Sequence, residues 1–203
     1  MRILKISRSN PNSQILLEAV NVLHAGGIVA HPTDTCYGLA VDVGNFVAVK
    51  KLRKLKGITD AHPFTIIPPT KKWVLENFVL NLVARNLTRK FWPGPLTLIL
   101  PLKQSKNKIK TCGVRIPDCK ISQKLVRLFG QPITTTSANR HGEKEAHEIS
   151  SLISLKPDLI LDGGKLPIRP TSTILDVSGK DLKILREGKV KIIKSGIMEK
   201  MGG

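Results

Sequence analysis

The sequence predicts an α/β fold, because short apolar runs typical of buried strands alternate with segments of helical periodicity. Glycines at positions 26 and 57 mark the ends of two helical segments, and polar stretches end several of the apolar runs. With 203 residues and 41% hydrophobic content, the chain is long enough to bury a core. We therefore expect a single domain over residues 1–203.

The first elements follow this punctuation in order. We expect a strand near residues 3–6, a helix over 13–24 that stops at Gly26, and a strand over 28–31. Asn45 can cap the next helix, in which residues 46, 49, 52 and 55 are apolar, and Gly57 suits the position after its last turn. Lys56 is therefore predicted to lie at a helix C-terminus.

The remaining strands are predicted from apolar runs in the second part of the chain, with helices between several of them. These strands are expected at residues 64–67, 96–100, 113–116, 133–136, 159–161, 172–177 and 182–185.

The cysteines and apolar runs restrict the cellular setting. Three cysteines, at positions 36, 112 and 119, form no close Cys/His pair, and Met1 to Lys5 lacks the long apolar core of a signal peptide. The apolar runs are far shorter than the roughly 20 residues that cross a bilayer. We expect a cytoplasmic, reduced protein without a metal site or membrane span.

The formal net charge of +18 leaves two interpretations open. Clustered lysine and arginine favour a polyanion such as RNA. Alternatively, cations such as Lys50 and Lys54 occupy a solvated helix face, and the sequence has neither a zinc-finger spacing nor an aromatic RNA-binding signature. The basic segment 103–110 is likewise either a mobile, solvated connector or an anion contact.

The stretch from His31 to Leu39 predicts a binding site. Pro32 alone could end the preceding strand, because it lacks a backbone N–H. Two threonines, a carboxylate and a tyrosine before Gly38 exceed what a connector needs.

Polar side chains also follow other predicted strands, where open α/β sheets commonly bind ligands. Ser137 and Asn139 end the run that begins at Ile133, and strand propensity explains them less well than it explains the threonines before them. Arg115 lies in an apolar strand, where a guanidinium needs an anion from the protein or from a ligand. Arg186 follows the apolar run 182–185, and its guanidinium likewise needs an anion from the protein or from a ligand.

In this order, the motifs resemble those of the YrdC-like family, whose best-known members are threonylcarbamoyl-AMP synthases acting in tRNA modification. The resemblance spans nearly the whole chain. It rests on residues 26–39, Lys56-Gly57, residues 91–97, 113–117, 136–139 and 172–176.

The resemblance implies a twisted open mixed β-sheet with flanking helices and a concave, positively charged pocket. It also implies that L-threonine, bicarbonate and ATP, with Mg²⁺, give threonylcarbamoyl-adenylate and pyrophosphate. Such chemistry requires cations that align two anionic reactants and no covalent nucleophile, so Cys36 is interpreted as a packing residue. The resemblance further implies two kinds of candidate partner, namely tRNA or double-stranded RNA, and proteins of tRNA modification.

The resemblance also assigns roles to individual residues. Threonine would be held by Thr35, Arg115, Thr135 and Ser172. ATP would be faced by Lys56, Ser137, Asn139 and Arg186. Lys56 and Arg115 are the predicted catalytic residues, and Tyr37 either shapes the pocket or packs in the core.

Two features differ from the pattern of the synthases. Ile58 stands where a Lys-x-Arg motif would place a phosphate-binding arginine, and either Lys54 or a cation of the segment 103–110 could replace it. The segments His62 to Thr65 and Arg186 to Gly188 are closer to the YciO branch of the family. The alternative function is therefore a YciO-like nucleotide- or RNA-binding protein with weak or different activity.

Overall fold

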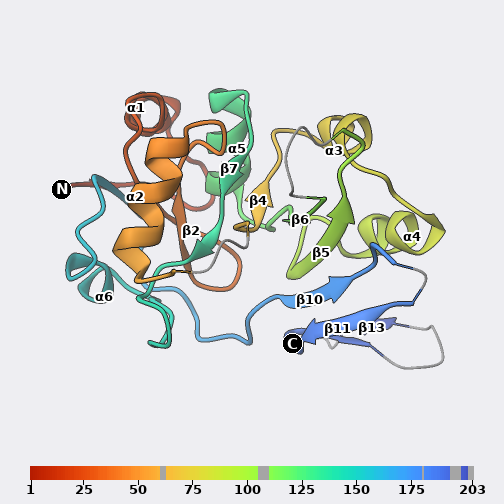
Figure 1. The fold of residues 1–203 in the computed structure, drawn as a ribbon. Coiled ribbons are helices and arrows are strands. Elements are labelled where there is room, and N and C mark those ends of the chain that lie inside the picture. The colour runs from red at the N-terminus through yellow and green to blue at the C-terminus, as the bar shows by residue number, and fades with distance from the viewer. Residues whose placement is uncertain (60–62, 105–109, 180, 193–197, 201–203) are drawn as a thin grey trace.

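Two open β-sheets with helices packed against them form the body of the protein in the computed structural model (Figure 1). The structure describes residues 1–59, 63–104, 110–179, 181–192 and 198–200. The predicted α/β fold with open mixed sheets is confirmed. Across these ranges, no helix is long and apolar enough to span a bilayer.

The five-stranded sheet combines strands from both halves of the chain. Its order is β1 (Arg2–Lys5), β9 (Leu159–Asp162), β2 (Val29–Pro32), β3 (Tyr37–Ala40) and β8 (Thr136–Ser137). β9 pairs in parallel with β1 and β2, whereas β3 is antiparallel to β2 and β8. The hairpin of β2 and β3 therefore lies inside the sheet, with partners on both sides.

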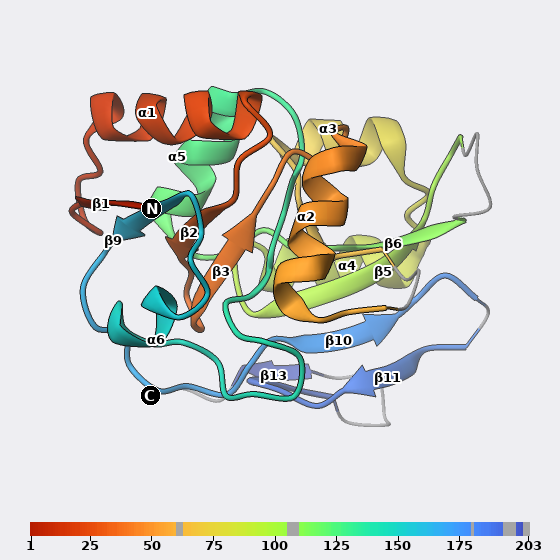
Figure 2. The same cartoon turned by 60° about the vertical axis from the view of Figure 1, so that its left-hand side comes forward.

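Helices cover both faces of this sheet. One face packs against α1 (Ser13–His24) and α5 (Lys120–Phe129), which lie beside each other in Figure 2. The other face packs against α2 (Phe46–Lys56) and α6 (Ser150–Ile153). Since the side chains of a strand point alternately to the two faces, β2 and β3 contribute to both apolar layers.

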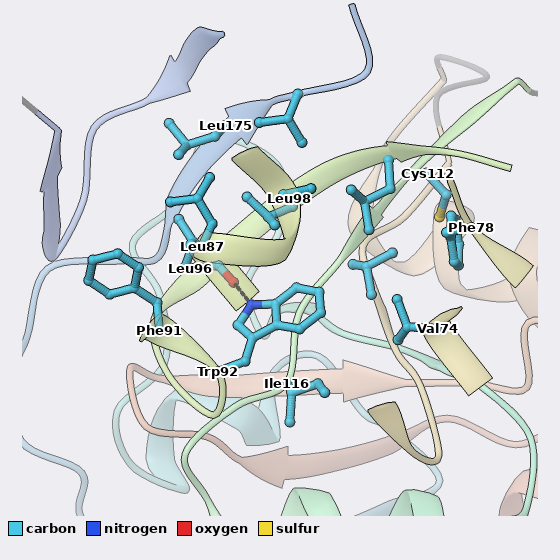
Figure 3. Close-up of a cluster of buried hydrophobic side chains, with 14 of the residues drawn as sticks. Val74, Phe78, Leu87, Phe91, Trp92, Leu96, Leu98, Cys112, Ile116 and Leu175 are labelled. Carbon is cyan, nitrogen blue, oxygen red and sulfur yellow. Dashed lines mark hydrogen bonds between the residues drawn. The ribbon is translucent and has the colours of Figure 1, made fainter. Parts of the chain in front are cut away.

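The six-stranded sheet has the order β11 (Lys183–Arg186), β10 (Thr173–Asp176), β5 (Leu96–Pro101), β6 (Thr111–Val114), β4 (Ile66–Ile67) and β7 (Ile133–Thr134). The helices α3 (Lys71–Asn77) and α4 (Leu82–Phe91) pack with it in a separate apolar cluster, shown in Figure 3. In that cluster, the buried indole of Trp92 donates a hydrogen bond from Nε1 to the carbonyl oxygen of Leu96 at 2.7 Å. β12 (Val190–Ile192) and β13 (Met198–Lys200) form an antiparallel pair.

The predicted start and end of α2 are confirmed. The side chain of Asn45 accepts a hydrogen bond from the backbone N–H of Ala48 at 3.0 Å, as an N-cap should. Gly57 adopts the left-handed conformation with φ of 70°, which glycine tolerates without steric cost. These two local signals place Lys56 in the last turn of the helix.

The single strand predicted over residues 133–136 is wrong, because the segment divides between the two sheets. Thr134 pairs with Ile66 in the six-stranded sheet, and Thr136 pairs with Leu39 in the five-stranded sheet. Between them, the backbone N–H of Thr135 donates to the carbonyl oxygen of Thr65 at 2.7 Å. Thr135 is therefore the point at which the chain passes from one sheet to the other.

Other parts of the chain can be compared with the expectation in the same way. β6 ends at Val114, so Arg115 follows the strand instead of lying within it. The stretch from His31 to Leu39, which was predicted as a binding site, also contains the start of the strand β3 at Tyr37. The basic segment predicted to connect two strands does join β5 and β6, but its residues 105–109 lie outside the described part of the chain.

Candidate functional site

A cavity of about 240 Å³ opens where the two sheets meet, and its wall draws on β3 and β8 from one sheet and on β5, β10 and β11 from the other. Most of the side chains assigned to a site from the sequence contribute to this wall. They are Thr35, Arg115, Thr135, Ser137, Ser172 and Arg186. Residues that are distant in the sequence therefore lie together where the two sheets meet.

Arg115 is held in the cavity wall by three protein acceptors. Its Nη2 forms a hydrogen-bonded ion pair with Asp34, and these two side chains are only 7% and 9% exposed. Its Nη1 donates to the hydroxyl of Thr35 at 3.3 Å, and its Nε donates to the carbonyl oxygen of Gly94 at 3.2 Å. A guanidinium has five N–H groups, so two remain to bind a ligand.

The loop between β2 and β3 is rigidly built around the hydroxyl of Thr33. This hydroxyl donates to the carbonyl oxygen of Cys36 at 2.7 Å and accepts from the backbone N–H of Thr35 at 3.1 Å. The backbone N–H of Cys36 also points at it, at 3.3 Å. These bonds fix the backbone that carries Asp34 and Thr35 and so preorganise the partners of Arg115.

Lys56 lies behind the cavity wall and binds the loop that follows β8. Its Nζ donates to the carbonyl oxygens of Ser137 and Asn139 at 2.6 and 2.8 Å, and to Oδ1 of Asn139 at 3.1 Å. These three contacts use the three N–H groups of the ammonium. Burial lowers the pKa of Lys56 to about 8. Lys56 thereby fixes the end of β8, whose Ser137 reaches the cavity, and the loop that follows.

Asn139 also lies outside the cavity wall, although it connects Ser137 to the surroundings. Its Oδ1 accepts from the hydroxyl of Ser137 at 2.6 Å, and its Nδ2 donates to the carbonyl oxygen of Glu143 at 2.7 Å. The structure therefore brings Lys56, Ser137 and Asn139 together, as the resemblance implied, in one hydrogen-bonded unit. Only Ser137 of the three faces the cavity directly.

Arg186 supplies a second guanidinium to the same wall. Its Nε and Nη2 donate to the carbonyl oxygen of Ser172 at 3.0 and 2.9 Å, and Nη2 also donates to the Ser172 hydroxyl at 2.8 Å. The Ser172 hydroxyl lies 3.0 Å from that of Thr97. Burial, and then the positive charge of Arg115, lower the pKa of Arg186. Two neighbouring guanidinium groups favour an anionic ligand.

Tyr37 and Cys36 line the cavity, but neither side chain ionises easily enough to be an activated nucleophile. The Tyr37 hydroxyl donates to the carbonyl oxygen of Gly164 at 2.9 Å and accepts from the N–H of Gly163 at 3.1 Å. Burial raises the pKa of Tyr37 to about 12 and also raises the pKa of the Cys36 thiol. Tyr37 therefore satisfies both interpretations, since it packs in the core and shapes the cavity.

The sequence interpretation missed two contributors. Asp34 is the anion that Arg115 needs, and the only local signal was its place between two threonines. Near the unusual Ile58, the guanidinium of Arg53 lies over the ring of Phe64, 4.9 Å from its centroid, and Phe64 lines the cavity. Of the YciO-like segment, His62 lies outside the described residues.

Comparison with known proteins gives consistent results. A family model for Sua5, YciO and YrdC, described as "Telomere recombination", matches residues 21–188. The uncharacterized protein YciO of Escherichia coli K12 is 29% identical over 193 residues, which cover 90% of this chain and 93% of YciO. The mouse threonylcarbamoyl-AMP synthase is 32% identical over 197 residues, which cover 91% of this chain and 68% of the synthase.

A solved structure shares the fold. The crystal structure of P. abyssi Sua5 complexed with L-threonine superposes with a TM-score of 0.85 at 29% identity, and the match covers 94% of this chain and 58% of that one. Because the family model matches most of the sequence and the same architecture recurs in Sua5, this chain belongs to the Sua5/YciO/YrdC family.

Proposed function

We propose that the protein is an L-threonylcarbamoyladenylate synthase, which forms threonylcarbamoyl-AMP and pyrophosphate from L-threonine, bicarbonate and ATP for the modification of tRNA. The observation that carries this proposal is the convergence of Arg115 with Thr35, and of Arg186 with Ser172, on one cavity. Relatives named threonylcarbamoyl-AMP synthase, at about 32% identity, and a Sua5 structure complexed with threonine support it.

Threonine is proposed to bind at the end of the cavity that contains Arg115. The two N–H groups of Arg115 that have no role in the protein contacts can receive a carboxylate as a bidentate pair. The hydroxyls of Thr35, Thr135 and Ser172 can form hydrogen bonds with the other polar groups of the bound threonine. Because Asp34 balances the charge of Arg115, this end of the cavity suits a zwitterion better than a small anion.

ATP is proposed to bind beside Ser137 and Arg186. Threonine carbamate must attack the α-phosphorus of ATP although both reactants are anions, so the barrier falls where fixed cations offset the repulsion. Arg186 supplies such a charge from the wall, and Lys56 fixes the position of Ser137 from behind it. Lys56 therefore acts on ATP through the loop that it holds.

Mg²⁺ is proposed to arrive with the triphosphate. This ion prefers phosphate oxygens and water together with one or two carboxylates, and does not need a complete cage of protein ligands. Within the described part of the chain, no group of three histidine, cysteine or acidic side chains gathers in a way that could hold a metal ion. The oxygens of the triphosphate would therefore supply most of the ligands of the ion, which would bind together with ATP.

Pyrophosphate release tests this function. The purified protein should release pyrophosphate only when ATP, threonine and bicarbonate are all present. Lys56→Ala should lose most of this signal because Ser137 loses its support, whereas Lys50→Ala, on the exposed side of the same helix, should keep it. A wild-type signal no higher than that of Lys56→Ala would contradict the proposal.

A second candidate function is RNA binding of the YciO-like kind, and a neighbouring cavity favours it. This second cavity, of about 460 Å³, shares Thr33 and Thr35 with the first. Four cations surround it, namely the exposed Arg8, Lys120 and Arg169 and the half-buried Lys189. Salt-dependent binding of tRNA without ATP turnover would support this function over the synthase.

A further inference from the structure

A third cavity, of about 330 Å³, is separate from the two cavities described above. It lies between the segment that leads from β4 into α3 and the helix α5. None of the described residues that line it lines the first or the second cavity. A ligand in the third cavity would therefore contact residues to which the proposed function gives no role.

The third cavity is largely apolar and preformed. Three branched side chains that line it are themselves buried, namely those of Ile67, Ile116 and Val126. Three proline rings, at positions 68, 69 and 93, line it as well. Because the ring of proline fixes its backbone φ, these residues hold the shape of the cavity without a ligand. Sites for small molecules are commonly apolar and largely formed in advance.

Few polar groups are available to the body of a ligand in this cavity. The amide of Gln123 is used at both ends, since its Nε2 donates to the carbonyl oxygen of Pro117 at 2.7 Å and its Oε1 accepts from Nη2 of Arg127 at 3.1 Å. The three lining prolines have no backbone N–H. A polar ligand body would lose its hydrogen bonds to water without replacing them. The cavity therefore selects an apolar body.

Two exposed cations lie at this cavity, Lys71 from α3 and Arg127 from α5. Nζ of Lys71 donates to the carbonyl oxygen of Trp92 at 3.0 Å, which leaves two of its three N–H groups for a ligand. The contact of Arg127 with Gln123 leaves four of its five N–H groups. Among the described lining residues, none is acidic. The two cations therefore favour an anionic group such as a carboxylate.

We propose that the third cavity binds an aromatic monocarboxylate, with its ring against the prolines and its carboxylate at Lys71 and Arg127. A rigid ring loses less conformational entropy on binding than a flexible aliphatic chain of similar size. A protein partner fits less well, because stable interfaces bury about 800 Å² on each partner and need a wider surface. The proposal does not depend on the synthase function, since the cavities share no described lining residue.

Calorimetric titration with naphthalene-2-carboxylate and its neutral analogue naphthalene-2-carboxamide tests this site. The wild-type protein should bind the carboxylate at a single site and prefer it by about tenfold or more, since charge-assisted hydrogen bonds are the stronger ones. The double variant Lys71→Gln/Arg127→Gln should lose this preference. The control Lys54→Gln/Lys72→Gln removes two charges from exposed positions outside the cavity and should keep it.

Two further titrations separate this site from other ways of binding the probe. Acetate, a carboxylate without a ring, should not bind at concentrations that saturate the site with naphthalene-2-carboxylate. L-threonine and ATP should not displace the probe, because they are proposed to bind in the first cavity. The proposal is overturned if the wild-type protein shows no saturable binding, if both double variants keep the same preference, or if threonine or ATP displaces the probe.

Discussion

The ammonium nitrogen of Lys56 lies 2.6 Å from the carbonyl oxygen of Ser137, so the last turn of α2 is fastened to the end of β8. Two further contacts to Asn139 complete the coordination of the ammonium. The consequence is that a helix outside the cavity controls the position of a hydroxyl within it. Lys56 therefore acts by positioning Ser137, whereas the guanidinium groups of Arg115 and Arg186 line the cavity themselves.

Replacing Lys56 by methionine should loosen the end of β8 and the loop that follows. The change leaves buried acceptor oxygens without donors, at a cost of about 1–3 kcal/mol in unfolding free energy for an unsatisfied group. The KM for ATP should rise more than the KM for threonine, because Ser137 belongs to the proposed nucleotide side. Urea denaturation and steady-state kinetics measure both effects. Lys54→Met, an exposed neighbour, is the control, and equal effects in the two variants would contradict the contact.

Removal of Arg115 should be costly even without substrate. Arg115→Met leaves Asp34 as an unpaired buried charge, and breaking such a pair typically costs about 3–5 kcal/mol in unfolding free energy. Adding Asp34→Asn to the same protein should recover part of that loss, because the uncompensated charge is gone. Denaturant titration of the two single variants and the double variant measures the coupling. Strictly additive effects would show that the two groups do not interact.

Stability should fall between pH 6.5 and 4 because of His31. The folded state lowers the pKa of His31 from 6.5 to about 4, so the unfolded chain binds more protons in this range and stability is lost as pH falls. The shift corresponds to about 3 kcal/mol. Urea denaturation of wild type and His31→Phe across this range isolates the contribution of His31 to the free energy of unfolding. If the unfolding free energies of the two proteins depend on pH in the same way, His31 is not a buried neutral imidazole.

Restoring an arginine at position 58 should increase synthase turnover. Ile58→Arg places a guanidinium at the end of α2, where the synthase pattern has one, and each 1.4 kcal/mol of recovered transition-state stabilisation gives about tenfold in rate. Ile58→Met, which adds length without charge, is the control. Pyrophosphate release measures the rates. No gain in Ile58→Arg would argue that ATP binds differently in this chain.

Local signals in the sequence predicted the elements best. The ends of α2 followed from Asn45 and Gly57, because capping depends on residues next to the helix end. The division of residues 133–136 between two sheets could not be read in the same way, since Thr134 and Thr136 have similar strand propensity and differ only in distant partners. The site shows the same contrast.

The resemblance indicated which side chains gather at the site, but not how they contact one another. Arg115 was expected to need an anion, yet its choice of Asp34 depends on a contact across 81 positions in the chain. The same is true of Lys56 and the loop at Ser137. The unpartnered Nε2 of His31 could not be predicted, because it depends on the orientation of the distant Ser122 hydroxyl, which makes Nδ1 the donor.

Mass spectrometry of the product made from ¹³C-bicarbonate tests the central claim most directly. The protein, incubated with ATP, L-threonine, Mg²⁺ and labelled bicarbonate, should form threonylcarbamoyl-AMP that carries the label, and omission of threonine should abolish it. Arg115→Met should form far less of this product than wild type. Active-site binding of ATP and threonine with no labelled adenylate in the wild-type reaction would contradict the synthase assignment.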